Sequence, residues 1–402
     1  MGMCHKTCPT SFQSHSVVFV VLFILGVHAL VSCQESDSGK KPGNVPATLA
    51  GKSAGALTEG KTLKLKKHSC IDARGTGGEA FSLLIPAGWQ FNGGVSWVFD
   101  NPTMPATIAF TVRNPSGHEE LEALPTLAMF WTDNQLTMSM FPPGSRYYGA
   151  EVMPMVSARE ALAKIILPRF RGGAADLKIV SFQPMPDLAK AVSGPSGQPG
   201  VQASIDAAKM RIEYTKDGTP MEEDIMAVVE GYTTSVPTFQ GVYTSTPWFV
   251  SYAISNRAEK GKLAGNALLF RAMTDSFRVS PQWYNTYNQV VTILVQNQLK
   301  FIRSMGELSR YISQTSGEIS ESMMQSYNER QKIYDRIGEK MSETIRGTAQ
   351  YYNPLEGTQV ELPNGYKHVW ASGTGEYLLT DSPGFNPNNG PGTTWQELEI
   401  RN

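Results

Sequence analysis

The stretch MRIEYTKDGTPMEEDIMAVVEGY, residues 210–232, has the pattern of two strands joined by a tight turn. Asp217-Gly218 is a residue pair that favours the two-residue turn of a β-hairpin. Apolar and polar residues alternate on both sides of this pair, and such alternation is typical of strands that bury one face. We therefore predict an antiparallel hairpin whose inward-facing residues are Ile212, Tyr214, Ile225, Ala227 and Val229.

The segments around this hairpin predict further strands and a few helices. Short apolar runs bounded by Gly, Pro or Asn indicate strands near residues 62–72, 79–89, 95–100, 106–112, 177–185 and 248–254. Ser157 and Glu160 have the spacing of a capping box, which marks the start of a helix. A second helix is expected over residues 263–277. Strands enclosed by helices favour an α+β fold in which helices flank an antiparallel sheet.

Two segments resemble the ends of PsbP-like domains. They are AFSLLIPAGW at residues 80–89 and LLFRAMTDSFRV at residues 268–279. That family includes the photosystem oxygen-evolving subunit, the Ran-binding Mog proteins and some mycobacterial lipoproteins. The resemblance implies an α/β/α sandwich around an antiparallel sheet over residues 62–280. The family has no shared catalytic residues, so the resemblance implies no site.

The N-terminal region has the features of a secretory signal. Residues 17–25 read VVFVVLFIL, and the polar stretch QESDSGKK begins at Gln34. The apolar run is shorter than the roughly 20 residues that a membrane-spanning helix needs. An apolar core of this length between a basic start, here Lys6, and small residues is typical of a signal peptide. We predict that residues 1–32 are removed, whether translation begins at Met1 or at Met3.

The sequence Leu30-Val31-Ser32-Cys33 resembles the lipobox of bacterial lipoprotein precursors. The resemblance implies that the Cys33 thiol receives a diacylglycerol and that cleavage occurs just before it. The alternative is an ordinary signal peptide with a chance cysteine. Gln34 in place of an aspartate favours the outer membrane, if the host has two membranes.

Composition limits what the exported chain does. Removal of the signal leaves 34 basic and 36 acidic residues, a net charge of −2, which argues against a nucleic-acid partner. Cys70 is then the one cysteine left besides the lipidated Cys33, so no disulfide forms within the chain. We expect Cys70 to be a partly buried residue of a strand. Residues 33–61 are rich in Gly, Ala, Ser, Lys and Pro and predict a flexible tether.

Residues 281–350 have a helical pattern. No proline lies between Pro281 and Pro354. Such a segment would form one helix of about 100 Å, or a helical hairpin that breaks at the capping box Thr315–Glu318. We expect this chain to cover the apolar stripe itself, and therefore a monomeric fold. The stripe consists of Tyr284, Tyr287, Val291, Leu294, Phe301, Met305, Leu308, Ile312 and Ile319, then, after a slip of four residues, Met323, Tyr327, Tyr334, Ile337, Met341 and Ile345.

Residues 351–402 predict a small all-β unit. VEL, YKHVWA and EYLLT read as short strands joined by turns. Its aromatic residues are a candidate surface for proline or sugar rings, because aromatic side chains concentrate at binding hot spots. The alternative is that they form the core of the unit. The candidates are Tyr366, Trp370, Tyr377 and Trp395, with Phe385 beside them.

No motif indicates a metal or a cofactor, and we expect neither. His68, His118 and His368 lie in separate segments without metal-ligand spacing. The run Glu222-Glu223-Asp224 could bind a cation, but a solvated strand face is the interpretation we adopt.

Three functions remain open. We expect a non-enzymatic envelope lipoprotein, anchored to the membrane through Cys33, that acts as an interaction or assembly module with a protein or glycan partner. The first alternative is a carrier of a lipid, peptide or glycan, which a deep apolar cavity between sheet and helices would favour. The second is an envelope hydrolase with scattered catalytic residues, which a histidine near a carboxylate and a Ser or Cys70 in a cleft would favour.

Replacing Cys33 by serine is expected to release the protein from membranes or to stall its processing, because serine has no thiol to accept the lipid. Palmitate labelling in the native host measures this directly. Equal labelling of the wild type and Cys33→Ser would contradict lipidation at this residue.

Overall fold

A computed structural model describes residues 62–99, 101–102, 104–193, 200–238, 241–296, 319–341, 348–390 and 392–400. The predicted signal, Cys33 and the tether lie outside these residues. So do the stripe residues from Phe301 to Ile312 and the Thr315–Glu318 capping box. Within the described residues, no helix is both long enough and apolar enough to cross a membrane.

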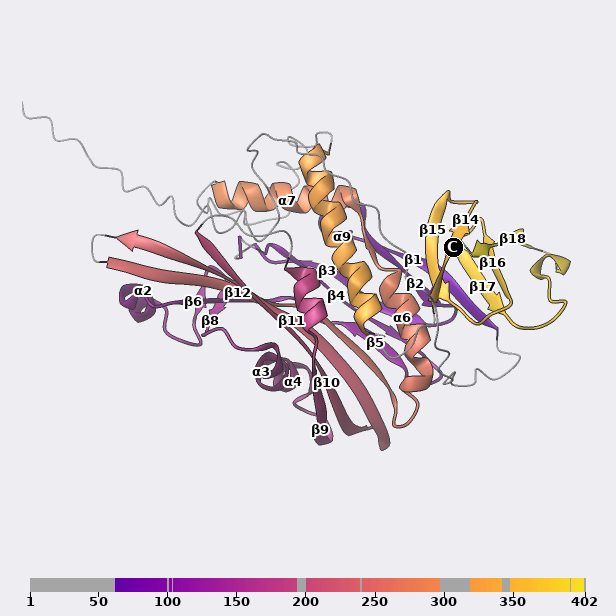
Figure 1. Cartoon of the computed structure of the whole chain (residues 1–402), viewed down its shortest axis with the longest axis horizontal. Coiled ribbons are helices and arrows are strands. Elements are labelled where there is room, and N and C mark those ends of the chain that lie inside the picture. Colours follow the sequence, from indigo (N-terminus) through magenta and orange to yellow (C-terminus); the bar gives the residue numbers. More distant parts are fainter. Residues whose placement is uncertain are drawn as a thin grey trace, which may run out of the picture.

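The largest sheet is antiparallel along its main path, β3-β4-β5-β12-β11-β10-β9 (Figure 1). The predicted hairpin is confirmed as β10 and β11, which pair from Val201–Thr234 to Lys216–Thr219. Asp217 and Gly218 both have positive φ, 49° and 78°, as this turn requires. The strands are β3 Gln90–Trp97, β4 Ala106–Arg113, β5 Glu120–Ala123, β12 Gly241–Glu259, β11 Thr219–Thr238, β10 Val201–Lys216 and β9 Ala175–Pro184.

A short group of strands lies beside this path. β6, Leu127–Thr132, pairs with β12, and its other neighbour, β8 at Ala150–Val152, runs parallel to it. β8 is joined to β7, Arg146–Tyr147, and the helix α2, Gln135–Met140, lies between β6 and β7 in the chain.

Both faces of the long hairpin are buried. The residues predicted to face inward pack against α3, Ala158–Ala161, the π-helical turn Leu162–Ile166 and α4, Leu167–Arg171. The predicted capping box is present, since Ser157 accepts from the Glu160 amide and Glu160 from the Ser157 amide. On the other face, Met226 and Val228 pack against α5, Pro186–Val192, and α9, Glu321–Met341. The α+β class with an antiparallel sheet is therefore confirmed.

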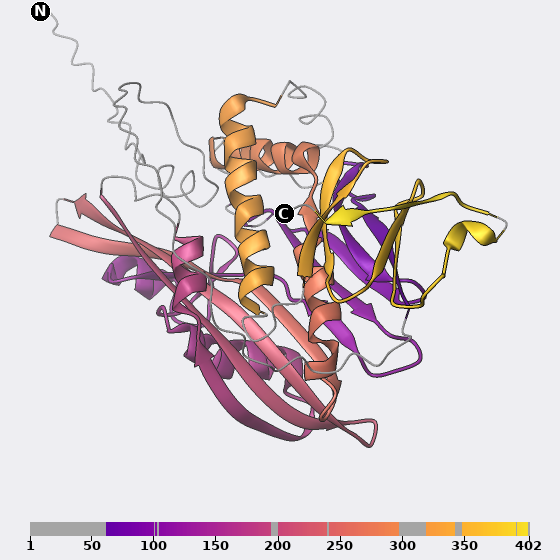
Figure 2. The ribbon, with the colours of Figure 1, turned by 45° about the vertical axis from the view of Figure 1, so that its right-hand side comes forward.

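Three helices lie over the face of the sheet opposite α3 and α4 (Figure 2). They are α6, Ala267–Asp275, α7, Pro281–Gln296, and α9. Residues 319 and 320 are not helical, and α9 runs steeply across α7, so residues 281–350 do not form one continuous helix (Figure 1). The described stripe residues pack within this chain: Tyr284, Tyr287 and Val291 are buried in its core.

The first described strand shares a sheet with strands from the C-terminal part of the chain. β1, Leu63–Ile71, pairs with β17, Glu376–Thr380. The full order of this sheet is β13-β2-β1-β17-β16-β18. The additional strands are β13 Arg278–Val279, β2 Glu79–Pro86, β16 His368–Ser372 and β18 Trp395–Glu397. A separate sheet contains β15, β14 and β19, at Thr358–Pro363, Thr348–Asn353 and Glu399–Ile400.

A buried carboxyl group lies where α6 meets this C-terminal region. Asp275 is 2% exposed, and Arg271 Nε donates to its Oδ2 at 2.9 Å. The same guanidinium contacts Glu361 of β15 at 3.2 Å. Burial first, and then the negative charge of Glu361, raise the pKa of Asp275 to about 7, although Arg271 acts in the opposite direction.

Asp275 predicts a pH dependence of stability. The pKa of Asp275 is about 7 in the folded state and 3.8 ordinarily. Its contribution to stability is therefore complete below pH 3.8 and is lost as the pH rises through about 7. The unfolding free energy should fall between these values by at most about 1.4 kcal/mol per pH unit. Urea denaturation across this range measures the slope.

Asp275→Asn should remove this part of the slope, because the amide does not titrate. The control is Asp176→Asn, an exposed carboxylate on β9. Identical pH profiles for the wild type and Asp275→Asn would contradict the assignment.

Candidate functional site

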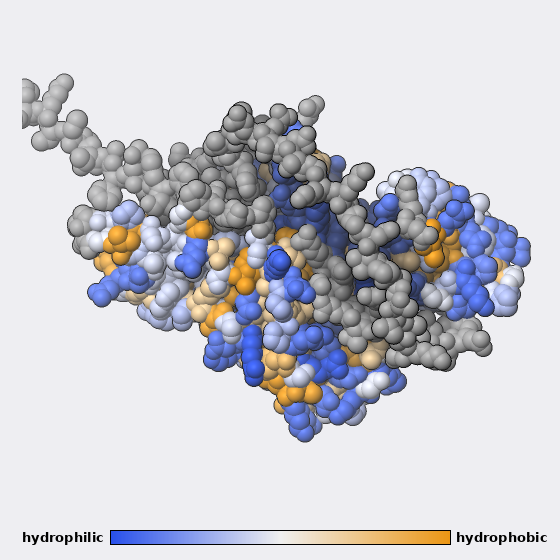
Figure 3. Space-filling model, in the orientation of Figure 1, coloured by the Kyte–Doolittle hydropathy of each residue, from blue (hydrophilic) through white to orange (hydrophobic). Residues whose placement is uncertain are grey.

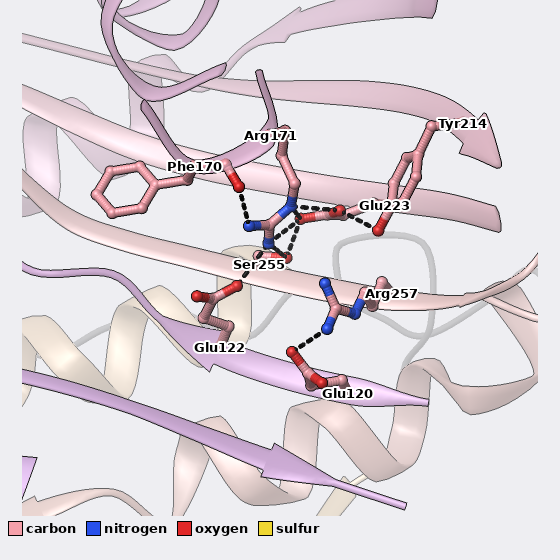
Figure 4. Close-up of polar contacts among 8 residues, drawn as sticks. All are labelled: Glu120, Glu122, Phe170, Arg171, Tyr214, Glu223, Ser255 and Arg257. Carbon is pink, nitrogen blue, oxygen red and sulfur yellow. Dashed lines mark hydrogen bonds and ion pairs between the residues drawn. The ribbon is translucent and has the colours of Figure 1, made fainter. Parts of the chain in front are cut away.

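A closed network of charged groups lies on one face of the large sheet (Figure 4). Arg171, in α4, donates to Glu223 of β11 at 2.7–3.0 Å and to Glu122 of β5 at 2.5 Å. Tyr214 donates to Glu223 at 2.8 Å, and Ser255 donates to it as well. Burial works against the charged form of Arg171, but Glu223 and then Glu122 outweigh it and raise the pKa of the guanidinium.

This network corrects the expectation for Glu222-Glu223-Asp224, which do not form a solvated strand face. Glu223 is completely buried, because Arg171 of α4 reaches over the sheet to pair with it. Glu222 accepts from the amides of Gly261 and Leu263, and Asp224 pairs with Arg211. Every carboxylate of the run has a partner in the protein. No group of three or more metal-ligand side chains occurs in the described part of the chain.

A cavity of about 180 Å³ lies on the opposite face of the same sheet. Its walls come from β4, β5, β11 and β12 on the sheet side and from α6, α7 and α9 on the helix side. An engineered apolar cavity of about 150 Å³ is large enough to bind benzene, so this one has room for a ring-sized molecule. Aromatic rings dominate the walls: Phe110, Phe249, Phe277, Trp283, Tyr284 and Tyr287.

A β-bulge in β12 shapes the wall. The register with β11 shifts between Met226 and Val228, which leaves one extra residue on β12. Tyr252 lies at this point with φ of 49°, a left-handed conformation that is uncommon for a tyrosine. Ser251 and Tyr252 therefore both line the cavity instead of pointing to opposite faces. The Tyr252 ring meets that of Tyr334 on α9 edge to face, with centroids 5.4 Å apart.

The cavity also contains one basic and one acidic side chain. Glu230 of β11 accepts hydrogen bonds from the hydroxyls of Tyr232, at 3.1 Å, and Ser251. Arg330 of α9 is partly buried and lines the cavity, with its guanidinium carbon 5.9 Å from the centre of the Tyr284 ring.

Arg330 stays charged in this position. Its pKa is raised well above the ordinary value: the largest influence is the negative charge that Tyr252 would carry if it ionised, and the Glu230 carboxylate adds to it, while burial opposes both. Burial raises the pKa of the Tyr252 phenol, so that phenol stays neutral. Within the described residues, no carboxylate oxygen lies within 4.0 Å of a nitrogen of Arg330.

The four aromatic residues predicted as a binding surface do not all share one face, although Trp370 and Trp395 lie on the same face of the β17-β16-β18 sheet. Tyr377 is 3% exposed, and its hydroxyl accepts from Asn353 at 2.9 Å. It lies opposite Ala371 in the β16–β17 ladder, so Trp370 points to the other face of that sheet. Tyr366 packs partly into the core around Tyr377, and the Trp395 ring lies 5.6 Å from Lys64 Nζ. On the face shown in Figure 3, hydrophobic residues form several separate groups among hydrophilic ones.

The histidines and Cys70 do not assemble a nucleophilic site. His68 stacks on Phe91 at 4.0 Å, whereas His118 and His368 contact Glu259 and Glu397 at 3.8 and 2.7 Å. Cys70 is buried in β1, close to the sequence-based expectation. Burial raises the pKa of its thiol, which disfavours the reactive thiolate.

Comparison with models of known protein families and with curated proteins finds no match to this chain. The chemistry of the cavity is therefore inferred from its own geometry. Sequence analysis did not identify Glu230, Tyr252 or Arg330. For Arg330 a signal existed, because residue 330 lies three positions after Tyr327 and four before Tyr334, on the apolar stripe of α9.

Arg171→Met should destabilise the protein by about 3–5 kcal/mol, because it leaves the Glu223 carboxylate buried without its cation. Combining it with Glu223→Gln should recover much of this loss, since Tyr214 and Ser255 can donate to the amide oxygen. Chemical denaturation of the two single variants and the double variant measures the coupling. Additive effects would show that the two side chains do not act as a pair.

Proposed function

We propose that this protein is an envelope lipoprotein that carries a small molecule in the aromatic cavity between its large sheet and α6, α7 and α9. The cavity itself is the observation that carries the proposal. The membrane anchor rests on the lipobox resemblance at Leu30–Cys33. An outer-membrane location follows from Gln34 if the host has two membranes.

Two unfavourable features at the cavity support a ligand. The strained Tyr252 and the charged Arg330 occur at the same place. Unfavourable features that coincide are characteristic of binding sites, because bound ligand compensates for them.

The carrier was the first alternative from sequence, and it now has a structural feature in its favour. The interaction module has less support from its candidate surface, because Tyr377 is buried on the opposite face of the sheet from Trp370 and Trp395. For the hydrolase, no histidine stands beside Glu230 and Ser251 among the described residues that line the cavity. Helices on both faces of the sheet are consistent with the PsbP-like resemblance, and we include membership of that family in the proposal.

Filling the cavity should abolish binding. Ala123 of β5 lines it, and Ala123→Phe would occupy the space of one ring. The wild type should bind indole, a neutral ring-sized probe, and be stabilised against heat by it. Ala123→Phe should weaken this binding by about tenfold or more.

The matched control is Ala175→Phe, at an exposed position on β9. It adds the same ring outside the cavity and should leave indole binding unchanged. Calorimetric titration compares the three proteins. An Ala123→Phe variant that binds indole as tightly as the wild type does would refute the carrier proposal.

A further inference from the structure

The charged side chains that line the cavity indicate the class of its ligand. This inference rests on the proposed function. We infer that the cavity binds a small zwitterion of the amino-acid type. Its carboxylate lies against Arg330, its ammonium group lies against Glu230, and its apolar side chain fills the aromatic part of the cavity.

Arg330 provides the site for the carboxylate. Its guanidinium borders the cavity, and within the described residues no carboxylate of the protein lies within 4.0 Å of it. Partial burial of a cation without a paired anion is unfavourable, and a ligand carboxylate reduces that cost. The planar fork of N–H donors on a guanidinium matches the two oxygens of a carboxylate. The Tyr284 ring, 5.9 Å away, also interacts favourably with the cation.

Glu230 provides the site for the ammonium group. One of its oxygens accepts from Tyr232 and the other from Ser251. A carboxylate has about four lone-pair positions, so acceptor capacity remains on both oxygens. An ammonium group carries three donors, and the tyrosine and tryptophan rings of the cavity walls attract cations.

The balance of charge favours a zwitterion over either single ion. Arg330 and Glu230 lie too far apart for an ion pair, yet close enough for Glu230 to contribute to the raised pKa of Arg330. A monoanion would leave the cavity with a net negative charge beside Glu230. A monocation would leave a net positive charge beside Arg330. A molecule that carries both groups on one carbon pairs both side chains and leaves the cavity neutral.

The volume limits the side chain of the ligand. About 180 Å³ has room for one ring or a branched aliphatic group. The walls that remain after Arg330 and Glu230 are mainly apolar, including Phe110, Phe249 and Phe277. An amino acid with a phenyl or branched apolar side chain fits these limits.

Three probes with the same ring separate the charges. Phenylalanine carries both charged groups, phenylpropanoate only the carboxylate, and phenylethylamine only the ammonium. In calorimetric titration of the whole protein, phenylalanine should bind about tenfold or more tightly than phenylpropanoate or phenylethylamine. Either single ion binding as tightly as phenylalanine would overturn the inference.

Two variants assign the groups. Arg330→Gln should weaken the binding of phenylalanine by about tenfold and should leave phenylethylamine bound at least as tightly as by the wild type. Glu230→Gln should weaken the binding of phenylalanine by about as much and should leave phenylpropanoate bound at least as tightly as by the wild type. Arg159→Gln is the control, an arginine 4.5 Å from the Phe182 ring on the other side of the sheet. If Arg330→Gln fails to fold, Arg330→Lys keeps the charge and should still weaken phenylalanine, because it loses the fork.

Indole separates failure of this inference from failure of the proposed function. Indole binding without any preference for phenylalanine over the single ions overturns the zwitterion and leaves the carrier. A wild type that binds none of the four probes overturns both. If Arg330→Gln loses affinity for all three charged probes equally, Arg330 has a structural role, and this result also overturns the inference.

Discussion

The hydrogen-bonded ladder between β11 and β12 is the constraint on which the rest of the structure depends. It runs from Met221–Glu259 to Thr238–Gly241 and is buried on both faces over much of its length. Because side chains alternate along a strand, every residue of β11 belongs to one of two environments. The face with Ile225, Ala227 and Val229 meets α3 and α4, and the face with Met226 and Val228 meets α5 and α9.

Two glutamates on β11 show how the same residue type serves different purposes on the two faces. Glu223 lies on the first face and is saturated by Arg171, Tyr214 and Ser255. A buried pair of this kind braces α4 against the sheet, and its opposite charges are already paired within the protein. Glu230 lies on the second face, beside a cavity, and Arg330, which lines the same cavity, is beyond ion-pair distance.

The cavity is assembled from distant parts of the chain. β4 and β5 form one part of its wall, β12 another, and α9 closes it with Arg330 and Tyr334. The C-terminal segments are joined to the same body, because β17 pairs with β1 and Arg271 of α6 bridges to Glu361 of β15. The site therefore requires α9 to pack back on the sheet, and Tyr327 and Gln331 contribute to this by hydrogen bonds to the carbonyls of Val279 and Phe277.

Local patterns in the sequence determined the hairpin at Asp217-Gly218, the capping box at Ser157 and the apolar stripe of the helices, because turns, caps and periodicity depend on neighbours along the chain. Tertiary structure alone decided the rest. It buried Glu223, since no local pattern shows that Arg171 reaches it. It placed Tyr377 on the opposite face of the sheet from Trp370 and Trp395, since the face on which each ring lies depends on strand register. It also brought Arg330 opposite Glu230, because contacts between residues about a hundred positions apart are set by how whole elements pack.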